Sequence, residues 1–236
     1  MQRAGRIVVA GLFALLMVAR AGFAATPDAK DEVLRKLDAA AAGFRSASAE
    51  FQFDSYQTDP IPDQETQKGT VYYERKAGSF QMAAHIREIN GKPTPKMYTY
   101  SGGQLRLFEP MINQVTTIAR AGKFESYLML GFGASGKELE EKWEIKYLGP
   151  DTLLDGKTSV KTEKLELVAK DPDVRKNIPK VTIWVDTVTG VNLKQVFDEG
   201  PGQYRVSVYF NIKVNQPLPA DAFTLKTDSK TQFVKR

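Results

Sequence analysis

Residues 181–214 read VTIWVDTVTGVNLKQVFDEGPGQYRVSVYFNIKV, and this stretch decides the fold class. Three runs of strand-forming residues are separated by two turn signals, Thr189-Gly190 and Gly200-Pro201-Gly202. Apolar and polar residues alternate along each run, which is typical of an antiparallel meander with one dry face and one wet face. The residues predicted on the dry face are Val181, Ile183, Val185, Val191, Leu193, Gln195, Tyr204, Val206, Val208, Phe210 and Ile212.

The rest of the chain supports a mainly β fold with few helices. Apolar residues at three- and four-residue spacing predict an amphipathic helix that begins near Thr26-Pro27 and ends near Gly43. Runs of strands interrupted only once by helical patterns favour an α+β domain rather than alternating βα units. Further strands are predicted at 49–53, 69–75, 80–86, 96–100, 105–110, 114–119, 143–147, 164–168 and 223–225, a polar loop at 171–173, an apolar lid at 123–132 and a helix at 135–143.

The N-terminus has the pattern of a secretory signal peptide. Arg3 and Arg6 precede a short apolar run, and Gly22-Phe23-Ala24 offers small residues at a cleavage site. The run is shorter than the roughly 20 residues that a spanning helix needs. We therefore expect residues 1–24 to be a signal peptide, residues 25–236 to form one domain, and the protein to reside in the periplasm of a Gram-negative-type bacterium.

Composition narrows the function classes. The formal net charge is +5, but the expected leader carries three arginines and no acidic residue, which leaves +2 for the remainder. A charge of this size does not indicate nucleic acid as a partner. The sequence contains no cysteine, so disulfides and thiolate metal sites are excluded.

A glycine-rich motif, GFGASGKE at residues 131–138, matches the dinucleotide pattern GxGxxG and almost matches a phosphate loop. A phosphate loop needs a hydroxyl where Glu138 stands, and a dinucleotide fold needs parallel strands linked by helices. The same letters fit a capping box, in which Ser135 caps a helix and Glu138 reaches back to it. We interpret the motif as a helix start and expect no cofactor.

Catalytic residues are scarce. The single histidine, His85, lies in a predicted strand, and no GxSxG motif is present to form a triad with it. One histidine cannot build a histidine cluster for a metal. A strand histidine usually serves packing or the surface, and the acidic residues Glu138, Glu140 and Glu141 indicate a solvated helix face. The sequence therefore predicts a protein that is not an enzyme.

The order of segments between residues 33 and 225 resembles the LolA-like family of periplasmic carriers of outer-membrane lipoproteins. The markers of this resemblance lie at 46–51, 69–75, 100–105, 108–110, 113–114, 165–167, 184–186, 210–212 and 218–223. The resemblance implies an incomplete antiparallel β-barrel, a half-rolled sheet whose concave face is covered by short helices. It further implies that acyl chains are held between sheet and helices.

The same resemblance implies the site. Arg75 takes the position of a family arginine that ties the lid shut, and a buried arginine bonded to lid carbonyls would act as a latch. Lys76 stands where the family has a proline, and segments 152–168 and 171–179 are longer than expected. The residues expected to line the acyl cavity and lid are Leu34, Leu37, Tyr73, Phe80, Met82, Leu107, Leu128, Leu130, Val208 and Phe210, with Arg75 as the latch.

The function implied is that of a monomeric chaperone that binds acyl chains of lipoproteins, or lipids, and moves them towards the outer membrane. Its partners would be an inner-membrane donor complex and an outer-membrane acceptor. An envelope lipid-sensing regulatory or scaffolding module on the same half-barrel is the alternative. An envelope hydrolase is a third possibility for which the sequence supplies no catalytic residues.

Overall fold

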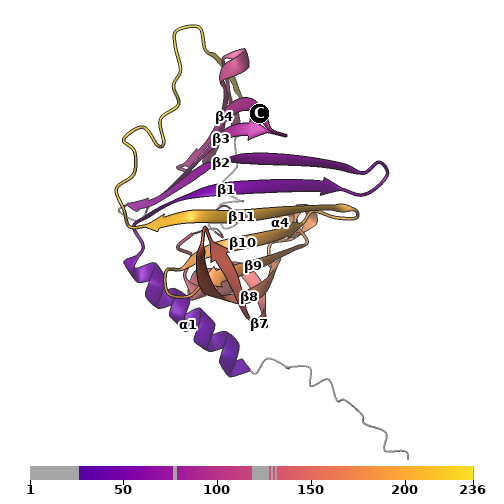
Figure 1. The fold of residues 1–236 in the computed structure, drawn as a ribbon, viewed down its shortest axis with the longest axis vertical. Helices are drawn as coiled ribbons and strands as arrows, with labels where there is room; N and C mark the ends of the chain where they lie inside the picture. Colours follow the sequence, from indigo (N-terminus) through magenta and orange to yellow (C-terminus); the bar gives the residue numbers. More distant parts are fainter. Residues whose placement is uncertain (1–26, 77–78, 119–127, 129, 131, 236) are drawn as a thin grey trace, which may run out of the picture.

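The computed structural model describes residues 27–76, 79–118, 128, 130 and 132–235 (Figure 1). The expected signal peptide, and most of the expected lid at 123–132, lie outside these residues. The N-terminal half consists of helix α1 (Pro27–Gly43), the short 3-10 helix η1 (Pro110–Ile112), and strands β1 (Ser46–Gln57), β2 (Asp63–Lys76), β3 (Ser79–Ile89), β4 (Lys92–Ser101), β5 (Gln104–Glu109) and β6 (Gln114–Ile118). The C-terminal half consists of helices α3 (Gly136–Lys142) and α4 (Pro172–Asn177), and strands β7 (Trp143–Asp155), β8 (Thr158–Ala169), β9 (Lys180–Asp186), β10 (Val191–Asp198), β11 (Gln203–Val214) and β12 (Gln232–Lys235).

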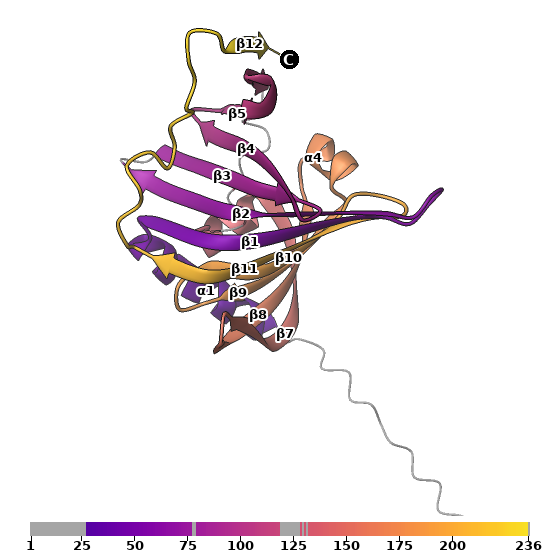
Figure 2. The same cartoon turned by 45° about the horizontal axis from the view of Figure 1, so that its top comes forward.

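These twelve strands of the described chain form one sheet in the order β12-β6-β5-β4-β3-β2-β1-β11-β10-β9-β8-β7. Every neighbouring pair is antiparallel except β12 and β6, which run parallel. Two meanders, β1–β6 and β7–β11, are joined where β1 pairs with β11 (Figure 2). Strands β7 and β12 stand at opposite ends, so the sheet is open. The predicted mainly β fold, an incomplete antiparallel barrel with short helices, is confirmed.

The two turn signals of the opening stretch end strands as predicted. Strands β9 and β10 are separated by a turn that contains Thr189-Gly190, where Gly190 has φ +70°. Strands β10 and β11 are separated at 199–202, where Gly200 and Gly202 have φ +112° and +71°. Residues without a Cβ adopt such left-handed conformations at little cost, which explains why glycines stand there.

Helices α1 and α3 lie on one face of the sheet, which we call the inner face. Val33, Leu34 and Leu37 of α1 are buried in one cluster with residues of β7–β10. The opposite half of the inner face, from β1 to β4 with β10 and β11, forms a second cluster that includes Phe51, Val71, Met82 and Tyr209. The periodic apolar face of α1 thus packs against only half of the sheet.

The other face of the sheet, the outer face, is partly covered by the C-terminal segment. Ala83, Met97, Phe108 and Val115 form a buried cluster there, and Phe223 and Leu225 pack against it. His85 on β3 shares a 2.8 Å hydrogen bond between its Nε2 and the Ala222 carbonyl oxygen. The lone histidine therefore serves packing, one of the two roles that the sequence favoured. The segment 216–231 runs across the sheet before β12 pairs with β6 (Figure 2).

In strand β11 the inner and outer faces are the opposite of those that the sequence predicted. Ser207 and Tyr209 are the buried residues, and they share the inner face with Phe51 and Phe53, their neighbours across the ladder to β1. Val208 and Phe210, paired with Gln52 and Glu50, lie on the outer face and are only partly buried. Their predicted placement on the concave face was wrong, because alternation reveals two faces without revealing which one faces the helices.

A β-bulge adds to this difference. Asn211 has φ +55°, its Nδ2 donates to Glu50 Oε1 at 2.9 Å, and the register between β1 and β11 shifts beside it. An extra residue in one strand reverses the faces beyond it. Ile212 and Val214 accordingly pack against the inner-face cluster, although Val208 and Phe210 do not.

Two other predicted elements differ. Residues 223–225, predicted as a strand, pair with no strand in the described chain, and the terminal strand is β12 instead. Residues 172–177, within the segment 171–179 that was expected to be a loop, form α4, because the Asp171 side chain accepts hydrogen bonds from the N–H groups of Asp173 and Val174 at 2.7 and 3.3 Å. Such capping is sufficient to start a short helix.

Candidate functional site

A cavity of about 290 Å³ opens on the inner face, beside the half of the sheet that α1 leaves uncovered. Ligand sites in proteins are typically apolar clefts of about 300–1,000 Å³ with a few placed polar groups, and this cavity stands at the lower end of that range. Its lining residues come from β1–β5, β10 and β11 and from Leu128: Phe53, Gln67, Val71, Tyr73, Met82, Ala84, Ile86, Tyr98, Leu105, Leu128, Gln195, Phe197, Arg205, Ser207 and Tyr209. Strands distant in the sheet order thus meet across one space because the sheet curves.

Aromatic residues pack beside the cavity. Phe132, almost fully buried, packs against Tyr73 with ring centroids 4.3 Å apart and meets Tyr209 edge-on at 5.2 Å. Phe53 meets Tyr209 edge-on at 6.0 Å. Edge-to-face and tilted pairs of this kind are favourable beyond the area that they bury. This packing fixes the position of the last residue of the expected lid, Phe132.

One wall of the cavity is polar. Gln195 on β10 lies directly opposite Ser207 on β11, and both side chains are buried. Arg205 follows on the same face of β11. Its Nη2 lies 3.2 Å from Glu199 Oε1, and its guanidinium lies 4.8 Å above the ring of Phe197. Three polar side chains thus stand together in a lining that is otherwise rich in apolar groups.

Tyr98 contributes a neutral hydroxyl to the same lining. Burial raises the pKa of its phenol, an effect that Lys96 opposes and Glu109 reinforces. A phenol whose pKa rises above its already high value stays protonated at neutral pH. Tyr98 therefore adds no charge to the lining.

Of the residues predicted for the site, three line this cavity: Tyr73, Met82 and Leu128. Phe80 belongs to the same inner-face cluster, and Leu107 faces inward beside Tyr98, but neither is in contact with the cavity. The remaining apolar residues of the prediction lie elsewhere, with Leu34, Leu37 and Leu130 in the cluster under α1 and Val208 and Phe210 on the outer face.

Arg75 points to helix α3. Its Nη2 lies 3.3 and 3.4 Å from the two carboxylate oxygens of Glu138, and its side chain is 25% exposed. Within the described residues its side-chain partner is thus a carboxylate. The expected bonds to lid carbonyls concern a segment that lies mostly outside those residues. The pair connects β2 to α3 across the inner face.

The predicted capping box is confirmed. Ser135 Oγ accepts from the Glu138 N–H at 3.0 Å, and Glu138 Oε2 accepts from the Ser135 N–H at 2.9 Å. The glycines around it allow close packing, because a Cβ at Gly133 would lie 2.4 Å from the Phe44 ring and one at Gly136 would lie 2.3 Å from the Leu34 carbonyl oxygen. The glycines of this motif therefore allow the chain to pack closely against helix α1 and Phe44.

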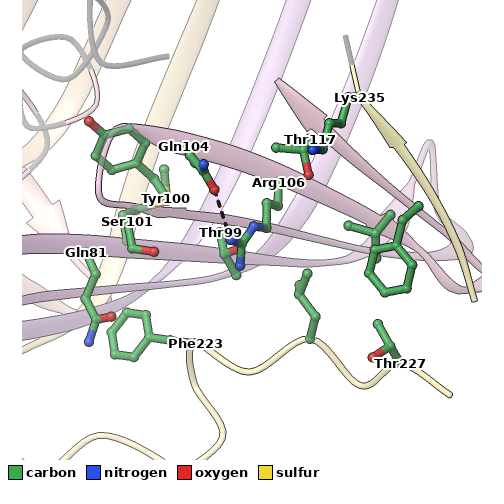
Figure 3. A pocket seen from close by; sticks show the side chains of 14 residues that line it. Gln81, Thr99, Tyr100, Ser101, Gln104, Arg106, Thr117, Phe223, Thr227 and Lys235 are labelled. Carbon is green, nitrogen blue, oxygen red and sulfur yellow. Dashed lines mark hydrogen bonds between the residues drawn. The ribbon is translucent and has the colours of Figure 1, made fainter. Parts of the chain in front are cut away.

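A larger cavity of about 620 Å³ lies on the outer face, between the sheet and the C-terminal segment (Figure 3). Arg106 donates to Gln104 Oε1 at 3.0 Å beside Thr99, Lys235 lies next to Thr117, and Phe223 and Thr227 border the other side. Size alone does not identify a binding site. The smaller inner cavity combines apolar walls with a buried polar cluster, so we take it as the candidate site.

Two features are absent from the described residues. Among them no three histidine, cysteine, aspartate or glutamate side chains are grouped as metal ligands would be. None of their helices combines the length and apolarity that crossing a membrane requires.

Sequence reasoning missed the polar wall of the cavity. Gln195 carried a signal, because it was predicted on a dry face between apolar neighbours, where a polar residue needs a hydrogen-bonding reason. Ser207 and Arg205 carried none, because they were assigned to the wet face of β11. Val71 and Leu105 were predicted as apolar strand residues without being assigned to a site.

Comparison with known proteins gives a fold and no family. No model of a known protein family matches the chain, and no curated protein matches it. An uncharacterized conserved protein from Thermus thermophilus aligns at 12% identity with a TM-score of 0.53, covering 87% of this chain and 98% of that one. MucB aligns at 12% identity with a TM-score of 0.51, covering 89% of this chain and 66% of its own.

A putative outer membrane lipoprotein-sorting protein domain from Vibrio parahaemolyticus aligns more loosely, at 13% identity and a TM-score of 0.43, covering 82% of this chain and 95% of that one. At 12% identity, the two matches with TM-scores above 0.5 show a shared fold alone, so function must be argued from the site.

Proposed function

We propose that this protein binds acyl chains of lipoproteins, or lipids, in the inner-face cavity and carries them through the periplasm towards the outer membrane. The cavity between the sheet and Leu128 is the observation that carries the proposal. It is supported by the resemblance of segment order to lipoprotein carriers and by the signal-peptide pattern of residues 1–24. The protein would act as a monomeric chaperone without catalysis, with a membrane donor and an outer-membrane acceptor as its partners.

Burial of hydrocarbon would supply the affinity. Each methylene removed from water contributes about 0.8 kcal/mol, so even part of an acyl chain binds usefully. The residues offered to it are apolar and come from several strands, including Val71, Met82, Ala84 and Ile86. Release is then the harder step, and it requires contacts that the protein makes only when the cavity is empty.

The first test is uptake of an acylated peptide by delipidated protein, measured by fluorescence anisotropy. Ala84, buried in the cavity lining, is replaced by phenylalanine to fill the space, whereas the exposed Ala220 receives the same change as a control. We expect Ala84→Phe to abolish uptake and Ala220→Phe to retain it. Wild-type protein that takes up no acylated peptide would refute the proposal.

The Arg75–Glu138 pair is proposed to favour the empty state. Removing it should leave cargo binding intact and slow release, because the closed arrangement loses a charge-assisted contact that competes with the ligand. We therefore expect Arg75→Leu to load with acylated peptide but to transfer it poorly to acceptor vesicles. Arg87→Leu is the matched control, since Arg87 bonds to Thr70 on the outer face.

The alternative is a regulatory or scaffolding module that senses lipid in the same cavity. Mass spectrometry of material that leaves the periplasm with the protein separates the two functions. Co-purified lipoproteins support the carrier, whereas a stable complex with a membrane regulator supports the module.

A further inference from the structure

The amide of Gln195 is an unusual feature of the cavity. The side chain is only 3% exposed, and its Oε1 accepts from the Tyr209 hydroxyl at 3.3 Å. Its Nε2 has no hydrogen-bond partner among the described residues. A buried donor without a partner is destabilising, and proteins seldom leave one without a reason.

The position of this donor points to a ligand. The one other buried side-chain atom without a partner in the described chain, Thr162 Oγ1, belongs to a residue that does not line this cavity. Gln195 does line it, next to Ser207. An orphan donor in the wall of a mostly apolar cavity offers a hydrogen bond to an acceptor atom that enters the cavity.

The charges around Gln195 indicate what kind of acceptor fits. The nearest cation in the lining, Arg205, is paired with Glu199 and lies over the Phe197 ring. The amide of Gln67, another polar lining group, donates to Glu65 Oε1 at 2.6 Å. Because the cationic group is already neutralised, a neutral oxygen is better matched to this wall than a carboxylate.

The opposite wall sets the direction of the ligand. Val71, Ala84, Ile86 and Leu105 extend the apolar lining across β2, β3 and β5, away from β10. A hydrocarbon chain lying there would place its polar end against β10 and β11. The cavity is thus suited to an amphiphile whose single oxygen-bearing group stands at one end.

We infer that Gln195 recognises the head of the acyl group, by donating a hydrogen bond from Nε2 to the neutral carbonyl oxygen of an ester- or amide-linked chain. This inference rests on the proposed acyl binding and names its specificity-determining residue. It explains why a dry-face position of β10 carries an amide, and it predicts that the protein distinguishes acylated molecules from plain hydrocarbon.

The experiment compares three probes that share a twelve-carbon acyl chain with one plain hydrocarbon of similar length, on delipidated full-length protein, by displacement of a solvent-sensitive dye. Methyl dodecanoate and N-methyl dodecanamide carry the neutral carbonyl, dodecanoate carries a carboxylate, and tridecane carries neither. Each is measured on wild type and on Gln195→Met, which keeps the side-chain length and removes the amide. Comparing variant with wild type cancels the different hydration of the probes.

We expect Gln195→Met to weaken binding of the ester and the amide about tenfold, which corresponds to about 1.4 kcal/mol, and to leave tridecane unchanged. Dodecanoate should bind wild type more weakly than the ester. Thr162→Val, which removes the other orphan group, should keep the wild-type preference. Methionine removes a buried amide whose Nε2 has no partner but whose Oε1 accepts from the Tyr209 hydroxyl, so melting curves must show that the variant remains folded before its affinities are compared.

The outcomes separate the two proposals. If wild type binds tridecane and ester but Gln195→Met changes neither, or both equally, acyl binding stands and the role of Gln195 is refuted. If dodecanoate binds more tightly than the ester, the inference that the cavity recognises a neutral head group is refuted. If no probe binds, the proposed function itself fails. A ¹³C-labelled ester carbonyl adds a readout on unaltered protein, since its infrared stretch should shift to lower frequency when bound.

Discussion

At the scale of single residues, Glu138 joins the start of helix α3 to strand β2. Its carboxylate accepts hydrogen bonds from the N–H and hydroxyl groups of Ser135 at the start of α3, and it forms an ion pair with Arg75 of β2. The capping part of this arrangement was predictable because its partners are three residues apart. The ion pair was not, because it joins residues separated by 63 positions.

Glu138 should make the stability of the protein depend on pH. Burial raises its pKa, but the hydrogen bonds from Ser135 and the charge of Arg75 together outweigh burial and hold the pKa below its usual value of 4.5. A carboxylate with a depressed pKa stabilises the fold above its unfolded pKa, and that contribution is lost as pH falls through the lower, folded pKa.

We expect Glu138→Gln to cost about 1 kcal/mol of unfolding free energy at pH 7, because it weakens a helix cap and a partly exposed ion pair. The difference from wild type should shrink as pH falls below about 4.5. Urea denaturation at several pH values measures it. Glu141→Gln, on the exposed side of the same helix, should show little difference at any pH. A constant difference across pH would contradict the assignment.

At the scale of elements, the sequence predicted where strands begin and turn better than which way they face. The turns at Thr189-Gly190 and at 200–202 were predicted from the local sequence, and both are present in the structure. The face of β11 depends on which side α1 covers, which is not encoded within the strand, and the bulge at Asn211 then reverses the faces of the residues beyond it. Because Ser207 and Arg205 lie on the inner face, they line the cavity. Positions where the residue type breaks the expected pattern are often functional sites, and these two polar residues stand at the candidate site.

The contact between helices α1 and α3 offers a matched pair of glycine substitutions. At Gly136 an added Cβ would lie 2.3 Å from the backbone oxygen of Leu34, so the helices must separate. At Gly43, the last residue of α1, nothing lies within 4 Å of such an atom. Steric overlap inside a packed contact typically costs about 1–3 kcal/mol, whereas alanine in open helical space is neutral or slightly stabilising.

We therefore expect Gly136→Ala to lower the unfolding free energy by about 1–3 kcal/mol and Gly43→Ala to leave it unchanged or raise it slightly, both measured by urea denaturation. Equal effects of the two changes would mean that helix propensity, rather than the close approach of α3 to α1, governs these positions.

At the scale of the whole molecule, the sheet order could not be predicted from periodicity. Strand β1 pairs with β11 more than 150 residues later, and β12 pairs in parallel with β6 across the end of the first meander. Such pairings depend on packing between distant segments, and the resemblance to lipoprotein carriers implied a half-rolled sheet without giving its strand order. It did not supply the C-terminal path, because β12 lies beyond the residues that carried the resemblance.

The path of the C-terminal segment over the outer face predicts that its attachment to the sheet depends on one small residue, Ala222. Ala222 is fully buried against the outer face, and its carbonyl oxygen receives the bond from His85. Ala220, two residues earlier, is exposed. Replacing Ala222 with aspartate would bury a carboxylate without a cationic partner, at a cost of several kcal/mol. The cheapest response is to detach the segment and leave the sheet intact, since local regions open at lower free energy than the whole fold.

We expect Ala222→Asp to raise the rate of tryptic cleavage at Lys226 and Lys230 by at least about tenfold for each 1.4 kcal/mol of destabilisation, because cleavage follows the population of the open form. Ala220→Asp should cleave at the wild-type rate. Binding of acylated peptide should survive in both variants, because the inner cavity is lined by neither the segment nor its contacts on the outer face. Loss of peptide binding together with faster cleavage would instead show that the two faces of the sheet are coupled.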